Sequence, residues 1–117
     1  MSTFRAEQLT EILNLHQMWL DREEGGKRAD LRSADLRRAN LEGANLKGAK
    51  LRAADLVGAN LNGANLNGAD LTHADLRDAK LRGADLRDAN LRMTDLRGVK
   101  IKGANLKGAN LKRAIRD

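Results

Sequence analysis

Leucine stands at every fifth position of this chain from Leu31 to Leu111, with Ile101 as the one substitute. Alanine stands two residues before each of these positions, except where Thr94 and Val99 replace it. A period of five fits neither an amphipathic helix nor a half-buried strand. In a helix, five residues turn by about 140° beyond a full circle, because one residue turns about 100°. The leucines would then share no common face, so the pattern argues against a helix.

The repeat instead predicts a short extended segment followed by a turn. If each leucine is position i, then i−2 and i point to one side of the extended chain, and i−1 and i+1 point to the other. Position i+2 is mostly glycine, which lets the backbone bend. One unit of five cannot bury its apolar side chains alone, so tandem units must stack into a solenoid. The predicted core is the column at i: Leu31, Leu36, Leu41, Leu46, Leu51, Leu56, Leu61, Leu66, Leu71, Leu76, Leu81, Leu86, Leu91, Leu96, Ile101, Leu106 and Leu111.

The pattern Ala-(Asp/Asn)-Leu-X-X, repeated over residues 29–114, resembles the pentapeptide repeat family. This resemblance implies an all-β solenoid, a right-handed quadrilateral β-helix with four pentapeptides per coil. Leucine at i and alanine at i−2 would fill its interior. Seventeen repeats would make about four coils, and positions twenty residues apart would stack about 4.8 Å from each other.

Residues twenty positions apart agree with a four-sided coil, because one register at i−1 is aspartate throughout: Asp35, Asp55, Asp75 and Asp95. Stacked carboxylates repel one another, so we expect compensation from the arginines at i+1 on the same side: Arg37, Arg77 and Arg97. Two other registers stack asparagines and predict ladders of side-chain amides: Asn40 with Asn60, and Asn45 with Asn65.

Residues 1–26 form a different unit from the β-helix expected over 27–117. Apolar residues recur there at steps of three and four, which predicts a helix within residues 4–20: Leu9, Ile12, Leu13, His16, Trp19 and Leu20. Ser2 or Thr3 can cap its start, and Gly25-Gly26 are expected to end it. We interpret the helix as a cap that covers the open core and strand edge of the first coil. A docking helix for a partner, or a dimer interface built on Trp19, is the alternative.

Charge is polarised along the chain. Residues 77–117 hold twelve Lys/Arg against five Asp, residues 1–26 hold two against five Asp/Glu, and the whole chain carries +6. Every i+1 residue from 77 onward is basic, and we call this set the basic belt: Arg77, Arg82, Arg87, Arg92, Arg97, Lys102, Lys107 and Lys112. Such a belt can attract nucleic acid or an acidic partner. Interleaved aspartates and the lack of aromatic residues among the arginines favour ordinary solvated charge instead.

The C-terminal end of the shaft lacks a helix comparable to the one expected at residues 4–20. The last coil would therefore expose part of its Leu/Ala interior. We expect the same end of a second copy to cover it, in an end-to-end homodimer. A different protein partner, or the side chains of Lys112, Arg113 and Arg116, are the alternatives.

The sequence offers no catalytic, cofactor or metal site. His16 lies on the apolar stripe of the helix and indicates packing, while His73 stands alone at an i+2 corner. Ser33 lacks a His–Asp arrangement, and the arginines beside the aspartate register argue against Ca²⁺ there. There is no cysteine, no run of 18 apolar residues and no signal pattern, so we expect a cytoplasmic protein without a membrane partner.

These features favour a non-enzymatic scaffold or protein-interaction module with an unidentified protein partner. The resemblance implies a second hypothesis, modulation of DNA gyrase or another topoisomerase by imitation of DNA. Residues 27–117 oppose it, because they carry twenty Lys/Arg against eleven Asp/Glu and have no phenylalanine at i. Binding of nucleic acid or an acidic partner through the basic belt is the third hypothesis.

Overall fold

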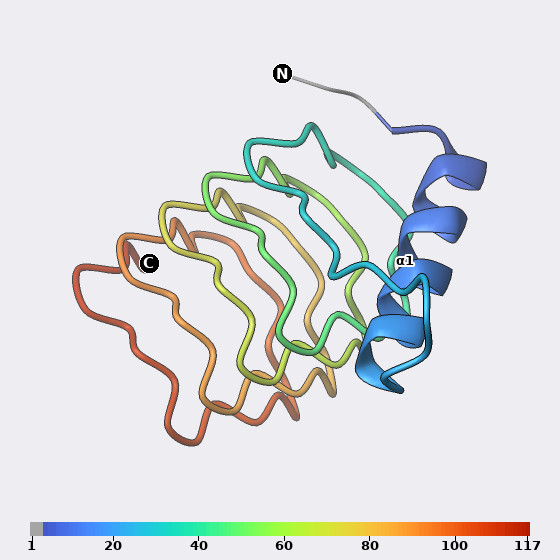
Figure 1. Cartoon of the computed structure of the whole chain (residues 1–117). Helices are drawn as coiled ribbons and strands as arrows, with labels where there is room; N and C mark the ends of the chain where they lie inside the picture. The colour runs from blue at the N-terminus through green and yellow to red at the C-terminus, as the bar shows by residue number, and fades with distance from the viewer. Residues whose placement is uncertain (1–3) are drawn as a thin grey trace.

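The computed structural model describes residues 4–117. Helix α1 (Ala6–Leu20) comes first, and the chain then winds in stacked coils to its C-terminus (Figure 1). Fourteen parallel backbone bridges join residues twenty positions apart, from Asp30–Lys50 to Asp95–Ile115. A coil therefore takes twenty residues, as the stacked registers predict. Within residues 4–117 the bridges are isolated single residues at i−1, so each side of the coil is shorter than a regular strand.

Each repeat from residue 29 to residue 93 is held to the next coil by three backbone hydrogen bonds. On one side of the first coil, the Lys50 N–H donates to the Ala29 carbonyl at 3.0 Å, and the Leu31 N–H donates to the Lys50 carbonyl at 2.8 Å. The Ser33 N–H donates to the Arg52 carbonyl at 2.9 Å. These bonds satisfy the backbone N–H and C=O groups between coils, so that even a short extended segment can form one side of the coil.

The corners of the coil lie at i+2, and all seventeen have left-handed backbone. Nine are glycines with φ between 66° and 77°, as the sequence predicts, and eight are other residues with φ between 57° and 62°. Left-handed φ is uncommon for residues with a side chain. Ala53 and Met93 nevertheless adopt it. The stacking of the walls therefore imposes the corner even where glycine is absent.

The core is the column of residues at i, and it is closed over most of its length. The leucines from Leu31 to Leu91 are at most 1% exposed. The prediction of a buried Ile101 is wrong, because its side chain is 41% exposed, and Leu106 and Leu111 are only half-buried. These three residues belong to the last coil, which has no further coil stacked on it within residues 4–117.

Helix α1 begins and ends at residues other than those expected. The expected caps, Ser2 and Thr3, lie outside the described residues. Arg5 is the N-cap residue, and its N–H donates to the side chain of Gln8 at 2.8 Å. The helix ends at Leu20, before the glycine pair.

The turn after α1 depends on two residues. Arg22 has left-handed backbone, with φ of 58°, and starts the reversal of the chain. Gly26 then passes against the helix so closely that a Cβ would collide with the backbone nitrogen of Trp19. The glycine pair therefore forms the joint, although it does not stop the helix.

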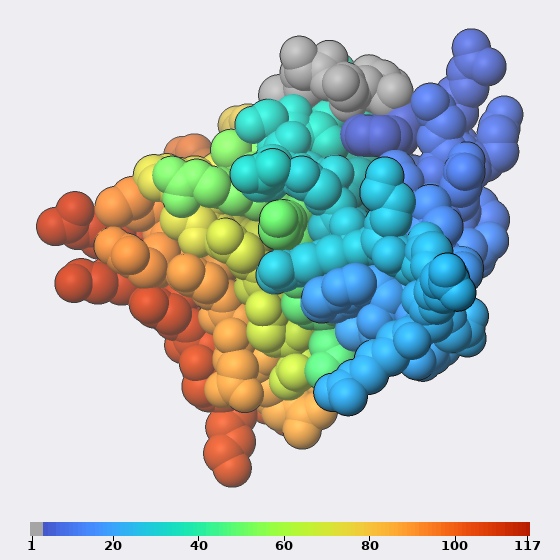
Figure 2. Space-filling view, in the orientation of Figure 1, coloured from blue at the N-terminus to red at the C-terminus, as the bar shows by residue number. Residues whose placement is uncertain are grey.

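Helix α1 packs beside the first coil and contacts it through Leu9 and His16, which are 7% and 0% exposed. Figure 1 shows the helix at one end of the stack, and Figure 2 shows red side chains of the last coil projecting at the other end. Within residues 4–117, α1 thus covers the first coil, and no element covers the last one, which we call the open end.

Candidate functional site

His16 joins α1 to the first coil by two backbone hydrogen bonds. Its Nδ1 accepts from the Ala29 N–H at 2.9 Å, and its Nε2 lies 2.8 Å from the Lys47 carbonyl oxygen. Since a carbonyl only accepts, Nε2 carries the proton and the imidazole is neutral. Burial lowers the pKa of His16; the hydrogen bond to Lys47 opposes this effect, and the charge of Arg28 adds to it.

These two bonds replace bonds that the repeat makes for itself elsewhere. Inside the shaft, the i−2 N–H donates to the preceding leucine carbonyl, as Ala49 does to Leu46 at 2.9 Å. An i+1 carbonyl accepts from the coil beneath, as Asn67 does from Gly48 at 2.9 Å. At the start of the first coil, one imidazole supplies both partners. His16 is therefore part of the cap through polar contacts as well as through packing.

Trp19 lies at the same junction. Its ring stacks on His16, with centroids 5.4 Å apart, and the guanidinium carbon of Arg28 lies 5.4 Å from its centroid. Arg28 also donates from Nε to the Gly48 carbonyl at 2.7 Å. The Trp19 side chain remains 39% exposed. Much of the ring therefore already serves the junction between helix and shaft, and one edge faces outward.

Aspartate and asparagine at i−1 have a role that the sequence analysis missed. At all fourteen such positions, the side-chain oxygen accepts the backbone N–H of the i+1 residue, at 3.0–3.3 Å. This is the local turn that Asx side chains favour. Asn60 and Asn65 stack on Asn40 and Asn45 as predicted, but within residues 4–117 no hydrogen bond joins the stacked amides, and their oxygens accept the backbone N–H instead.

The aspartate register is compensated by arginine, as expected. Arg77 lies 2.7 Å from Asp75 and 3.8 Å from Asp95 in the next coil. Arg37 likewise lies 2.7 Å from Asp35 and 3.9 Å from Asp55. Each arginine thus bridges two stacked carboxylates. The hydrogen bond from Arg77 lowers the pKa of Asp75.

The basic belt is not uniform around the shaft. Arg77, Arg87 and Arg97 each pair with the aspartate two residues earlier. The hydrogen bond from Arg87 lowers the pKa of Asp85 to about 2. The other belt residues follow lysine or asparagine at i−1, so they have no carboxylate at that position: Arg82, Arg92, Lys102, Lys107 and Lys112.

One side of the shaft carries lysine at i−1 as well as a basic residue at i+1, and the ammonium of Lys100 there donates to the Gly98 carbonyl at 3.1 Å. The backbone bridge between Lys80 and Lys100 stacks these two residues, and the Gly83 N–H bonds to the Lys102 carbonyl one coil above. Four exposed cations therefore lie together on this side, which we call the lysine side: Lys80, Arg82, Lys100 and Lys102. The belt thus differs between sides: both arginines are paired on the side of Arg77 and Arg97, and none of the four cations of the lysine side has an aspartate at i−1.

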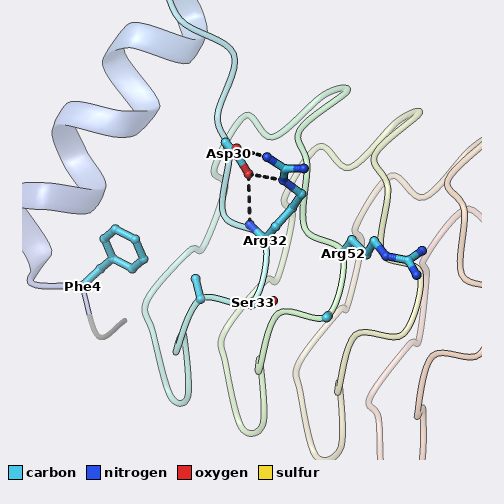
Figure 3. Close-up of a pocket in the computed structure, with 7 residues that line it drawn as sticks. Phe4, Asp30, Arg32, Ser33 and Arg52 are labelled. Atoms are coloured by element: carbon cyan, nitrogen blue, oxygen red, sulfur yellow. Dashed lines mark hydrogen bonds and ion pairs between the residues drawn. The ribbon is translucent and has the colours of Figure 1, made fainter. Parts of the chain in front are cut away.

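Two hollows occur at the ends of the shaft. At the open end, a largely apolar mouth of about 220 Å³ is lined by core residues, among them Leu96, Ile101 and Leu111. At the other end, Phe4 points toward the first coil at Ser33, beside a hollow of about 510 Å³ (Figure 3). Arg32 in that hollow bonds to Asp30 and lowers its pKa to about 2.

Within residues 4–117, no three His, Cys, Asp or Glu side chains come close enough to hold a metal ion. His73 lies exposed at its corner, with φ of 62°. Over the same described range, no helix has the length and apolar character needed to cross a membrane.

The sequence pattern of the family described as pentapeptide repeats matches this chain over residues 27–63, 44–83, 54–92 and 79–115. These segments together cover more than half of the chain. The chain belongs to the pentapeptide repeat family. Comparison with curated proteins found no match.

Solved structures of pentapeptide repeat proteins are similar to this chain. One is alr5209 from Nostoc PCC 7120, with 36% identity over 99% of this chain and 88% of that one, and a TM-score of 0.75. Another is HetL from the cyanobacterium Nostoc sp. strain PCC 7120, a protein involved in heterocyst differentiation regulation. It has 44% identity over 75% of this chain and 43% of that one, with a TM-score of 0.73.

A trypsin-treated variant of QnrB1, a plasmid-mediated fluoroquinolone resistance protein, is also similar. It has 26% identity over 75% of this chain and 45% of that one, with a TM-score of 0.68. This chain therefore spans less than half the length of HetL and of that QnrB1 structure.

Proposed function

We propose that this pentapeptide repeat protein is a non-enzymatic scaffold, a right-handed quadrilateral β-helix that binds other proteins, with residues 1–26 as its cap. The observation that carries the proposal is the open end of the shaft. Ile101 and Ile115 are 41% and 48% exposed there, beside the apolar mouth of about 220 Å³. Exposed apolar surface rimmed by polar residues is typical of protein-binding sites.

We propose further that the partner at this end is a second copy, bound end to end. The same face on both copies would meet around a two-fold axis, the commonest arrangement of homodimers. Such contact would bury Ile101 and complete the packing of Leu106 and Leu111.

Sedimentation equilibrium tests this proposal. The parent protein should show a concentration-dependent dimer, and Ile101→Lys should be monomeric because it places a charge in the apolar contact. Val57→Lys, on the half-exposed wall of the shaft, is the matched control and should dimerise like the parent. A parent protein that stays monomeric, or an Ile101→Lys variant that dimerises as well as the control, contradicts the end-to-end dimer.

Modulation of DNA gyrase by imitation of DNA, which the resemblance to the pentapeptide repeat family implies, is the second candidate. The charge opposes it, because DNA is an anion and this chain carries +6. A supercoiling assay with gyrase and added protein decides the matter. We expect no change in supercoiling, and inhibition or protection of gyrase would favour this candidate over the scaffold.

A further inference from the structure

We propose that the lysine side binds a short acidic segment of another protein, with carboxylates at alternate residues. The proposal rests on the function proposed above, that of a protein-interaction module. It concerns a different surface, because none of the four cations lines the apolar mouth, and Lys80 and Arg82 lie one coil away from the open end.

The lysine side departs from a rule that most of the shaft follows, as Lys50 also does on another side. Fourteen of the seventeen i−1 residues are Asp or Asn, whereas Lys80 and Lys100 cannot accept the i+1 N–H. The Arg82 N–H bonds instead to the side chain of Asn62 in the coil beneath, at 2.9 Å. Within residues 4–117 the Lys102 N–H has no acceptor. Positions that break a local structural rule are often functional ones.

Lys50, the third lysine at i−1, shows what an ordinary structural lysine looks like here. Its backbone bridges join it to Asp30 in the first coil and Asp70 in the coil above. Opposite charges therefore flank it along the stack. Lys80 and Lys100 are bridged to each other, and like charges directly opposite destabilise a sheet. A bound anion would relieve this repulsion.

The spacing of the four cations suits alternate carboxylates. Neighbouring coils lie about 4.8 Å apart, so a carboxylate between two coils can contact both members of a stacked pair. The pairs are Lys80 with Lys100, and Arg82 with Lys102. Two residues of extended chain separate the pairs, a distance of about 6.8 Å, which is also the spacing of alternate side chains on an extended peptide.

The borders of the lysine side favour a short segment over a long polyanion. Asp117 accepts from the Gly98 N–H at 2.8 Å, and the Asp78 carboxylate lies beside the same glycine, at the corner before Lys100. A nucleic acid strand laid across the wall would meet these two acids. The lysine side also has no aromatic residue on which bases could stack.

Fluorescence anisotropy with a labelled peptide of alternating glutamate and serine tests the proposal. The test variant replaces all four cations of the lysine side: Lys80→Gln, Arg82→Gln, Lys100→Gln and Lys102→Gln. The control variant removes the same charge from elsewhere at the same end: Lys107→Gln, Lys112→Gln, Arg113→Gln and Arg116→Gln. We expect the test variant to bind roughly tenfold more weakly, as the loss of four exposed ion pairs implies, and the control to change less than about twofold.

Three results would overturn the proposal. One is equal weakening by both variants, which would mean that only net charge matters. Another is a DNA oligonucleotide of the same charge that binds as tightly as the peptide. The last is a peptide that the parent protein does not bind. Circular dichroism confirms that both variants fold, and sedimentation of the test variant should match the parent. Failure of the end-to-end dimer is thus distinguishable from failure of this proposal.

Discussion

The two ends of the shaft are made of the same repeat and have opposite exposures. Beneath α1, the core leucines from Leu31 to Leu46 are at most 1% exposed, whereas Ile101 in the last coil is 41% exposed. The difference lies in what covers each end and not in the repeat. The repeat forms the walls of the shaft, and the core at each end of the shaft must be covered by something other than the repeat.

The cover that α1 provides has an apolar and a polar part. Leu9 lies buried in the core cluster, while His16 satisfies the backbone of Ala29 and Lys47. At the open end Ile115 is 48% exposed, and the Ile101 N–H has no coil-to-coil bond within residues 4–117. A complete cap of a coil must therefore satisfy backbone groups as well as bury side chains.

The largest expected effect on stability comes from a substitution in the middle of the shaft, far from both ends. Leu66→Lys would place a charge in a fully buried position, at a cost that should exceed the usual 5–15 kcal/mol of domain stability. Circular dichroism should show no cooperative unfolding transition. His73→Lys, at an exposed corner, is the control and should keep the cooperative unfolding transition. A Leu66→Lys protein that melts like the parent would show that leucine does not face the core.

Trimming one core residue at each end compares the ends directly. Leu36→Ala, beneath α1, should lower the free energy of unfolding by about 2–5 kcal/mol, because it leaves a cavity. Ile101→Ala should cost less than about 1 kcal/mol, because its side chain is already partly in water. Urea unfolding measures both under conditions where the protein is monomeric. Equal losses would contradict the difference between a closed and an open end.

The polar part of the cap can be removed separately. His16→Ala would strand the Ala29 N–H and the Lys47 carbonyl, each at a cost of about 1–3 kcal/mol if no water replaces the imidazole. His73→Asn is the matched control, since asparagine tolerates the left-handed corner. Urea unfolding with tryptophan fluorescence reports on the junction, because Trp19 is the chain's only tryptophan. Loss of stability in the control alone would refute the assigned role of His16.

The smallest expected effect is a dependence of stability on pH through the same residue. Because folding lowers the pKa of His16, its contribution is complete above the unfolded value of about 6.5. The contribution should be lost as the pH falls from there toward the folded pKa, since protonation removes the acceptor for Ala29. The urea midpoint should fall between pH 7.5 and pH 5 in the parent, and should stay level over this step in His16→Ala.

The architecture of the shaft could be predicted from sequence because it repeats. The column of leucines and the aspartate register twenty residues apart both depend on local, periodic features, and Arg77 lies between Asp75 and Asp95 as expected. The role of Asp and Asn at i−1 was also readable, since these residues commonly accept a backbone N–H two positions later.

Other features depend on contacts that no period encodes. His16 bonds to Lys47, thirty-one residues away, so its polar role appears only when the helix is placed on the coil. The exposure of Ile101 depends on its place in the last coil and not on the five-residue period. The difference between paired and unpaired residues of the basic belt became clear from the ion pair of Arg87 with Asp85. Arg82 has no such pair, because Lys80 stands two residues before it.

The hydrogen bonds that tie each coil to the next also set the order in which the molecule can come apart. A repeat inside the shaft is held from above and below, whereas one at the open end is held from below only. Unfolding should therefore start at the C-terminal coil and proceed coil by coil toward α1. Limited proteolysis or mechanical pulling would then leave a shortened shaft that still carries α1. Amide hydrogen exchange should be fastest in the last coil and slow progressively toward α1.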